Sequence, residues 1–245
     1  MKSLLIALTL SLAGLAPALA ADLPVKAPPL QPAVVAPYDW SGFYVGANVG
    51  GGWSTVAATN HGNTTAFGDY GRKQGFNADM SGVIGGGQIG YNFQRGHVVF
   101  GIDALLDASG LEGSWKSTVG NKDDQFSTKT DVLTLITGRL GYAWDNVLLY
   151  GKGGLAGSRL KVSVVDTVPP ATGAGNDTQW AWGWTLGAGL EYAIARQWSA
   201  GIEYDYASFG SKNFQLAGTG GGSYLFSSNV RDLHLLMLRV NYRIN

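Results

Sequence analysis

The sequence predicts an all-β fold, an eight-stranded antiparallel up-and-down transmembrane β-barrel with short periplasmic turns and long extracellular loops. Apolar side chains alternate with small or polar ones along many stretches, which indicates strands with two different faces. A tyrosine-centred segment recurs about every 50 residues, and this repeat sets the number of strands. After residue 20 no apolar run reaches the ~18 residues of a membrane-spanning helix, so a membrane-embedded chain must cross with strands.

The first 20 residues, MKSLLIALTLSLAGLAPALA, have the features of a secretory signal peptide. Lys2 supplies a positive charge, residues 4–15 are mostly apolar, and residues 18–20 form a small-x-small cleavage site. An uncleaved anchor helix is the alternative, for which the apolar run is short. Residues 21–37 hold five of the eight prolines and predict an extended periplasmic tether, which leaves residues 38–245 for the barrel.

The composition limits the chemistry that the chain can perform. It contains no cysteine, which excludes disulfides, thiol catalysis and thiolate metal sites. The formal net charge is zero, so nothing indicates a nucleic-acid partner. Charged residues make up only 14% of the chain and glycine contributes 37 residues, a balance that is unusual for a soluble domain. We expect neither a metal nor a cofactor.

Four segments share the tyrosine-centred pattern: GQIGYNF, TGRLGYAW, GAGLEYAI and LRVNYRI. Their tyrosines, Tyr91, Tyr142, Tyr192 and Tyr242, are separated by 51, 50 and 50 residues. Very short turns follow the first three segments, and the two-residue Asp-Asn turn at 145–146 is typical of a tight hairpin. A second alternating strand follows each turn, so four repeats of two strands give eight.

The repeat places the strands in order along the chain. The predicted ranges are 41–55, 80–94, 97–109, 129–144, 147–164, 179–194, 197–209 and 230–244. Each is at least as long as the ~9–11 residues with which a tilted strand crosses a bilayer. The other strand ends lead into polar stretches near 56–78, 109–128, 165–178 and 209–229, which we expect to be loops. This asymmetry is typical of bacterial outer-membrane barrels and predicts an outer-membrane location.

The apolar face of the strands is rich in aromatic residues near the strand ends. In WAWGWTLGAGLEYAI, residues 180–194, three tryptophans stand at every second position. Such residues form the interfacial girdles of membrane barrels, which predicts that this face points toward lipid. The predicted girdle consists of Phe43, Tyr91, Phe93, Tyr142, Trp144, Trp180, Trp182, Tyr192, Trp198 and Tyr242. The alternative is a soluble lipocalin-like carrier, which would bury the same face in its core.

The opposite face carries the charges together with many glycines, which suits the crowded lumen of a narrow barrel. Buried charges must be paired, so we expect an internal salt-bridge network that fixes the barrel. Its predicted members are Asp103, Asp107, Arg139, Lys152, Glu191, Glu203, Asp205, Arg239 and Arg243. The alternative is a charged conduction path. Leu233, Leu235 and Met237 share this face, and either a bulge or a locally apolar lumen would explain them.

The opening YDWSGFY (38–44) and VGANVGGGWS, the hairpin ends GYNF and GYAW, and the closing LRVNYRI carry a family resemblance. They resemble the small outer-membrane β-barrel proteins of alphaproteobacteria such as rhizobia and Brucella, also called the porin family with an OmpA-like barrel. The resemblance implies an abundant surface protein that supports envelope integrity and contact with a host or the environment. Some relatives are reported to bind haem, but no motif here supports a haem site. Ile244-Asn245 departs from the family's C-terminal aromatic residue, which the barrel-assembly machinery reads.

The histidines are the starting point for any catalytic site. His61 falls in the first loop, His97 at a turn and His234 near the outer end of the last strand. Nucleophilic catalysis needs a base beside a nucleophile and an orienting group, and only His234 with Ser227, Ser228 and Asp232 offers such a set. An interfacial histidine beside a polar loop explains the same residues, so we expect no enzyme.

These observations predict a structural outer-membrane barrel that supports the envelope and displays surface loops. The alternatives are a narrow channel for ions or small solutes, a lipid A modifying enzyme centred on His234, and a soluble carrier. The expected partners are outer-membrane lipid and lipopolysaccharide, together with the barrel-assembly machinery during biogenesis. The sequence does not identify a ligand for the loops.

Overall fold

A computed structural model describes residues 38–60, 75–118, 124–166, 173–217 and 223–244. The predicted signal peptide and tether, residues 1–37, therefore lie outside the described residues, as do His61 and Asn245. No helix among the described residues is long and apolar enough to cross a membrane.

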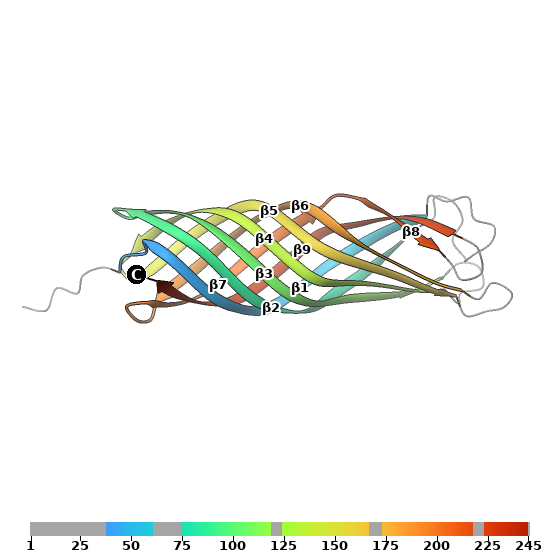
Figure 1. Ribbon diagram of the computed structural model, residues 1–245, viewed down its shortest axis with the longest axis horizontal. Helices are drawn as coiled ribbons and strands as arrows, with labels where there is room; N and C mark the ends of the chain where they lie inside the picture. Colours follow the sequence, from blue (N-terminus) through green and yellow to red (C-terminus); the bar gives the residue numbers. More distant parts are fainter. Residues whose placement is uncertain (1–37, 61–74, 119–123, 167–172, 218–222, 245) are drawn as a thin grey trace, which may run out of the picture. The chain divides into compact units, whose positions relative to one another are not determined.

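The described strands form one closed antiparallel ring (Figure 1). They are β1 (Gly42–Asn60), β2 (Gly75–Arg95), β3 (Val98–Lys116), β4 (Gln125–Trp144), β5 (Val147–Asp166), β6 (Gly173–Ala193), β7 (Trp198–Phe209), β8 (Lys212–Ala217) and β9 (Ser223–Ile244). Each strand pairs with the next in sequence as far as β7, and β1 pairs with β9 to close the ring. Because β7 and β8 both pair with β9, one after the other, the nine strands occupy eight positions. The predicted eight-stranded barrel is confirmed.

The strands are longer than predicted at the end of the ring that we call the loop end, opposite the hairpin turns. β3 reaches Lys116, β4 starts at Gln125 and β6 starts at Gly173, so most of the polar stretches expected to be loops are paired strand. Polar side chains on the outer face do not end the pairing of two strands. The backbone N–H and C=O groups still form hydrogen bonds with the neighbouring strand outside the membrane. The predicted loop boundaries are therefore wrong by up to seven residues, as at Lys116 of β3 and Ser223 of β9.

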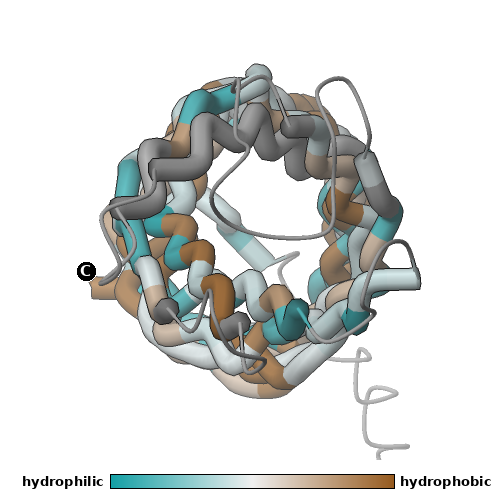
Figure 2. The backbone as a smooth tube through the Cα atoms, turned by 90° about the vertical axis from the view of Figure 1, so that its right-hand side faces the viewer, coloured by the Kyte–Doolittle hydropathy of each residue, from teal (hydrophilic) through white to brown (hydrophobic). Residues whose placement is uncertain are grey.

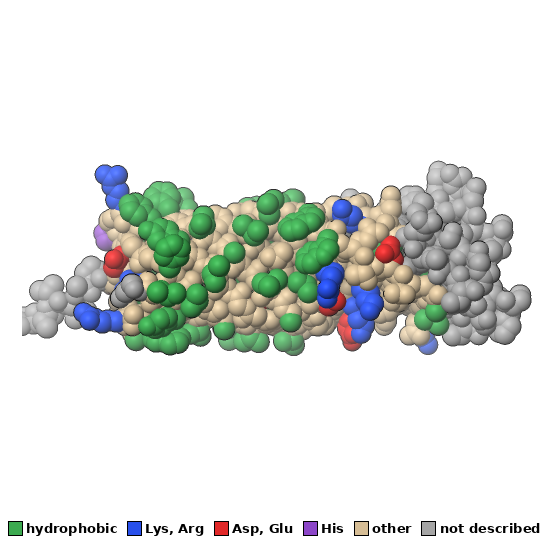
Figure 3. Space-filling model, viewed as in Figure 1, with side chains coloured by type: hydrophobic (Ala, Val, Ile, Leu, Met, Phe, Trp, Pro, Cys, Tyr) green, Lys and Arg blue, Asp and Glu red, His purple; other side chains and the backbone are tan. Residues whose placement is uncertain are grey.

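The outer face of the ring is apolar over the part nearer the turn end. Large side chains are more than half exposed at Phe43, Ile102 and Leu140. Figure 3 shows hydrophobic side chains along this side of the ring and charged side chains toward its two ends. A band of exposed apolar side chains between polar ends is the outer surface of a barrel that sits in a bilayer.

The interior changes character along the ring. Nearer the turn end the lumen is mostly polar and charged, with a small apolar cluster that includes Trp40, Val99 and Leu148, whereas nearer the loop end it holds a larger apolar cluster. We call this larger cluster the apolar layer; its members include Val56, Met80, Ile84, Leu105, Leu111, Phe126, Leu133, Leu135, Leu160, Val162, Val164, Phe209, Phe214, Leu233, Leu235 and Met237. Figure 2 looks along the ring from the loop end and shows hydrophobic and hydrophilic residues alternating along the strands. A locally apolar lumen is thus the explanation of Leu233, Leu235 and Met237.

Bulges mark the height at which the outer face turns from apolar to polar. Ser54 of β1 stands opposite two residues of β9, Asp232 and Leu233. Asp131 of β4 is an extra residue in the ladder with β5, and a further irregularity separates Ala108 from Leu111 in β3. A bulge shifts the alternation by one residue, so β4 turns odd positions inward on one side of Asp131 and even positions inward on the other.

A substitution in the apolar layer tests whether its packing stabilises the barrel. Ile84→Val removes one methylene from a side chain that is 1% exposed, and we expect the free energy of unfolding to fall. The expected loss is about 0.5–1.5 kcal/mol. Urea unfolding in lipid vesicles measures it, with Ile89→Val on the same strand as the control, because Ile89 is 60% exposed toward lipid. Equal losses for the two variants would contradict a packed apolar layer.

Candidate functional site

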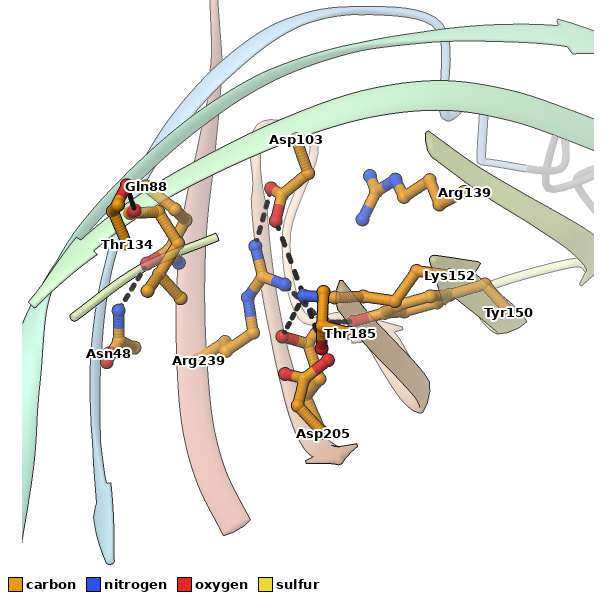
Figure 4. Close-up of polar contacts among 12 residues, drawn as sticks. Asn48, Gln88, Asp103, Thr134, Arg139, Tyr150, Lys152, Thr185, Asp205 and Arg239 are labelled. Carbon is orange, nitrogen blue, oxygen red and sulfur yellow. Dashed lines mark hydrogen bonds and ion pairs between the residues drawn. The ribbon is translucent and has the colours of Figure 1, made fainter. Parts of the chain in front are cut away.

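The charged part of the lumen is centred on Glu203 of β7, and Figure 4 shows Asp103, Lys152, Asp205 and Arg239 of the same part. The Glu203 carboxylate accepts hydrogen bonds from the Arg239 guanidinium and from Lys152 Nζ, the latter at 2.8 Å. Arg239 also donates to Asp103 at 2.8 Å, and Lys152 lies 3.4 Å from Asp205 and 3.7 Å from Asp103. Charged residues from β3, β5, β7 and β9 therefore meet on the axis of the ring and tie opposite walls together.

Two tyrosines complete this central network. Tyr44 donates to Asp103 at 2.5 Å, and Tyr150 donates to Glu203 at 2.6 Å. Their rings lie over glycines of neighbouring strands: a Cβ added at Gly90 would come 2.2 Å from the Tyr44 hydroxyl, and one at Gly189 would come 2.4 Å from Tyr150. The glycines are needed because the inward-pointing rings take up the space of a side chain.

Arg139 forms a second group nearer the turn end. Its guanidinium donates to Glu191 at 2.9 Å and to Asn92 at 2.8 Å, and it lies over the Tyr44 and Tyr150 rings at 4.7 and 5.0 Å. In Figure 4 Arg139 lies to one side of the Arg239–Lys152 group. The two tyrosine rings thus join the two charged groups through cation–π contacts.

Asp107 is held by amides rather than by a cation. Asn48 donates to the Asp107 carboxylate at 2.9 Å and to Gln88 at 3.0 Å, and Gln88 donates in turn to Asn241 at 2.8 Å. Asn241 also donates to Glu191, which connects this chain of amides to the second charged group. The amide chain runs across β1, β2 and β9 at the seam where the ring closes.

The structure places Arg243 outside this network. Its guanidinium donates to the Arg196 carbonyl at 3.0 Å and lies 4.7 Å from the Tyr38 ring centre. Tyr38 and Trp40 pack edge to face beneath the lumen, and burial raises the pKa of Tyr38. Arg243 stands near the end of β9, where an inward-pointing side chain reaches the turns instead of the middle of the lumen. Its position on the inner face therefore does not place it beside the buried acids.

Five carboxyl groups and three cations of the predicted set are thus packed in the lumen, each at most 5% exposed. A cavity of about 20 Å³ lies between the Tyr38–Trp40 pair and the second charged group, and Arg139 and Glu191 form part of its wall. This holds about one water molecule. Above the network, the apolar layer fills the lumen with side chains that are at most 7% exposed.

Sequence reasoning missed Tyr44, Tyr150 and the amides Asn48, Gln88 and Asn241. All five stand on the inner face of their strands, in the same alternation as the charges. The pattern that identifies them is their position on the inner face, at every second residue along the strand together with glycines such as Gly46 and Gly90. Selecting only charged residues on that face left them out.

The predicted girdle residues all lie on the outer surface. Most are about 40–60% exposed: Phe43, Tyr91, Phe93, Tyr142, Trp144, Trp180, Trp182, Tyr192 and Trp198. Several pack in pairs across strands, such as Trp198 with Tyr242, whose rings are tilted by 60° with 5.0 Å between their centres. Trp182 lies over Gly157, where an added Cβ would come 2.8 Å from its ring.

His234 lies on the outer face near the loop end, in an aromatic cluster. Its Nδ1 is 2.7 Å from the Tyr204 hydroxyl, its ring stacks on Trp53 at 5.4 Å, and Tyr206 donates to the neighbouring Asp232. The side chains of Ser227 and Ser228, the nucleophiles considered with it, lie outside the described residues. Among the residues that the structure describes, no group of three or more His, Asp or Glu side chains is placed to hold a metal ion.

Comparison with known proteins decides the family. Residues 6–243 match the model of the outer membrane protein beta-barrel domain.

The chain belongs to this family.

Relatives in the outer membrane protein beta-barrel family support the same assignment. The 25 kDa outer-membrane immunogenic protein of Brucella abortus is 31% identical over 233 residues, covering 94% of this chain and 95% of the relative. The 22 kDa outer membrane protein of Rhizobium leguminosarum is 32% identical, covering 72% and 68%. The solved structure of OprG from Pseudomonas aeruginosa is 12% identical, with a TM-score of 0.48, and covers 83% of this chain and 97% of that one. The predicted family and outer-membrane location are confirmed, and the soluble carrier is excluded.

Proposed function

We propose that this outer-membrane protein is a structural barrel with a closed lumen. It supports the envelope and presents the segments 61–74, 119–123, 167–172 and 218–222, which connect its strands at the loop end. Outer-membrane lipid and lipopolysaccharide are its partners along the outer face, and the barrel-assembly machinery is its partner during biogenesis. The proposal includes no catalytic role.

The filled lumen is the observation that carries this proposal. Two layers stand in series across the interior: the charged network around Glu203 and Arg239, and the apolar layer above it. A hydrated ion would have to displace paired charges in the first layer and then lose its water in the second. Both steps are costly because buried ions need partners and apolar surfaces offer none.

The channel is the alternative that the proposal rejects. An eight-stranded barrel has an interior just wide enough for side chains, whereas water-filled porins have about 16 strands. All the lumen charges except Asp107 pair with one another; Arg239, for example, contacts both Asp103 and Glu203. The eight charged side chains of the described lumen are each at most 5% exposed.

Ion flux through the purified barrel tests the proposal directly. We expect proteoliposomes to release trapped K⁺ no faster than empty vesicles, and planar bilayers to show no discrete current steps. A 16-stranded porin at the same protein-to-lipid ratio is the positive control. Heat-modifiable migration on gels confirms that the inserted chain is folded. Reproducible single-channel steps from folded protein would overturn the closed barrel.

The proposed role in envelope support is tested in living cells, beside the flux measurement on the purified barrel. Deleting the gene in the native bacterium is expected to raise sensitivity to bile salts, and the wild-type chain is expected to restore resistance. Restoration without ion flux is the result expected of a structural barrel. Unchanged sensitivity in the deletion strain would remove the envelope role while leaving the closed lumen intact.

A further inference from the structure

A cavity opens on the outer face of the ring at the β1–β9 bulge. It measures about 220 Å³ and is lined mainly by Trp53, Thr55, Asp79, Ser81, Asp232 and His234. The cavity exists because Ser54 has two residues opposite it on β9, which interrupts the even spacing of the ladder. Bulges commonly re-aim side chains next to functional sites.

One wall of the cavity is aromatic. Trp53 is 47% exposed and stacks on the His234 ring, with 5.4 Å between ring centres and 12° between planes. Tyr204 and Tyr206 support His234 from the other side, at 6.1 and 5.5 Å. The result is a fixed flat surface that faces outward instead of into the core.

The rest of the cavity wall carries side-chain oxygens that form hydrogen bonds. Asp79 accepts from Thr55 at 3.1 Å, and Asp232 accepts from Tyr206. Asp232 has a φ of 59°, a conformation that is unusual for a residue other than glycine. Non-glycine residues in such conformations cluster at ligand-binding sites, where the surrounding structure holds them in place.

We propose that this cavity binds a neutral sugar ring of a glycan. The flat aromatic wall suits the C–H face of a pyranose, and the carboxylates of Asp79 and Asp232 accept hydrogen bonds from its hydroxyls. Two carboxylates in one cavity repel phosphate and other anions, so the site selects an uncharged part of the glycan.

The position of the cavity points to its occupant. Below it the outer face is apolar, with Leu236 and Leu238 exposed, and above it β1 continues to the polar Thr59. The cavity therefore lies at the loop-end edge of the apolar band, where the oligosaccharide of an outer-leaflet glycolipid lies against the barrel. The proposed ligand is a neutral sugar of the lipopolysaccharide core. This inference does not depend on the closed lumen.

Calorimetric titration of the full barrel tests the proposal. The probe is core oligosaccharide released from the lipopolysaccharide of the native bacterium by mild acid and dephosphorylated. Amine-oxide micelles are used because maltoside detergents carry a sugar headgroup that would compete. We expect saturable binding to the wild type and affinity weaker by about tenfold or more in Asp232→Asn and in Trp53→Ala. Asparagine tolerates a positive φ, so Asp232→Asn keeps the backbone conformation.

The chain offers a matched control for each variant. Asp145 also has a positive φ, of 48°, and Trp198 is 45% exposed and packs against the Tyr242 ring, but both lie at the turn end. We expect Asp145→Asn and Trp198→Ala to bind like the wild type. Absence of saturable binding to the folded wild type, or equal affinity in all four variants, would overturn the proposal. Heat-modifiable migration shows that each variant is folded.

Discussion

Replacing Arg239 with methionine is expected to lower the free energy of unfolding by about 3–5 kcal/mol, because it leaves buried carboxylates without their cation. Arg239 is 1% exposed and bridges Asp103 and Glu203, which would then share only Lys152. Methionine keeps most of the volume, so the loss reports the charge and not a large cavity. Urea unfolding of the barrel in lipid vesicles, followed by tryptophan emission, measures the change.

An exposed ion pair of the same chemistry is the control. Arg159 and Asp131 form a two-pronged salt bridge outside the ring, with side chains 42% and 44% exposed. Water screens the attraction between exposed charges, so Arg159→Met should change stability far less than Arg239→Met. If both arginine variants lost the same amount, the central network would not be what holds the walls together.

Gly189→Ala is the second change with a large expected effect. The new Cβ would lie 2.4 Å from the Tyr150 ring, which must move and give up its 2.6 Å hydrogen bond to Glu203. Overpacking costs about 1–3 kcal/mol, and losing a hydrogen bond to a charged group about 1.5–3 kcal/mol. We expect a total loss near 3 kcal/mol or more in the same unfolding measurement.

Two comparisons isolate the contact with Tyr150. Gly138→Ala points toward lipid with nothing within 4 Å of the new Cβ, and its stability should stay the same or rise by up to about 1 kcal/mol. In a Tyr150→Ala background, Gly189→Ala should cost far less, since the clashing ring is gone. Additive effects of the Gly189 and Tyr150 changes would rule out the proposed contact.

Much of the fold follows from the sequence because a barrel strand has a simple period. Ile102, Ile202 and Leu238 face lipid while their neighbours Asp103, Glu203 and Arg239 face the lumen, as alternation requires. The ion-pair partners of the lumen residues are harder to predict from the sequence. Arg239 and Asp103 are 136 residues apart, and only the closure of the ring brings them together. Alternation specifies a face but not the height at which two inward residues meet.

The strand ends were misjudged for a related reason. Polar composition predicts loops there, although apolar residues persist on alternate positions, as at Val56 and Ala58 of β1. These residues point inward, opposite to the apolar residues of the membrane band. The extra residue at Asp131 also reverses the alternation in β4, so a single count along the strand fails there.

The apolar layer has a thermodynamic consequence of its own. Unfolding the part of the ring beyond the bulges exposes Phe126, Val162 and their neighbours to water, which raises the heat capacity as in a water-soluble protein. In the membrane-spanning part of the ring, the outward apolar side chains stay in contact with hydrocarbon. Their contribution to the heat-capacity change is therefore small. Because hydrophobic stabilisation weakens on cooling, we expect the loop-end half of the ladder to lose stability in the cold before the membrane half does. One continuous sheet thus contains two sections that respond differently to temperature.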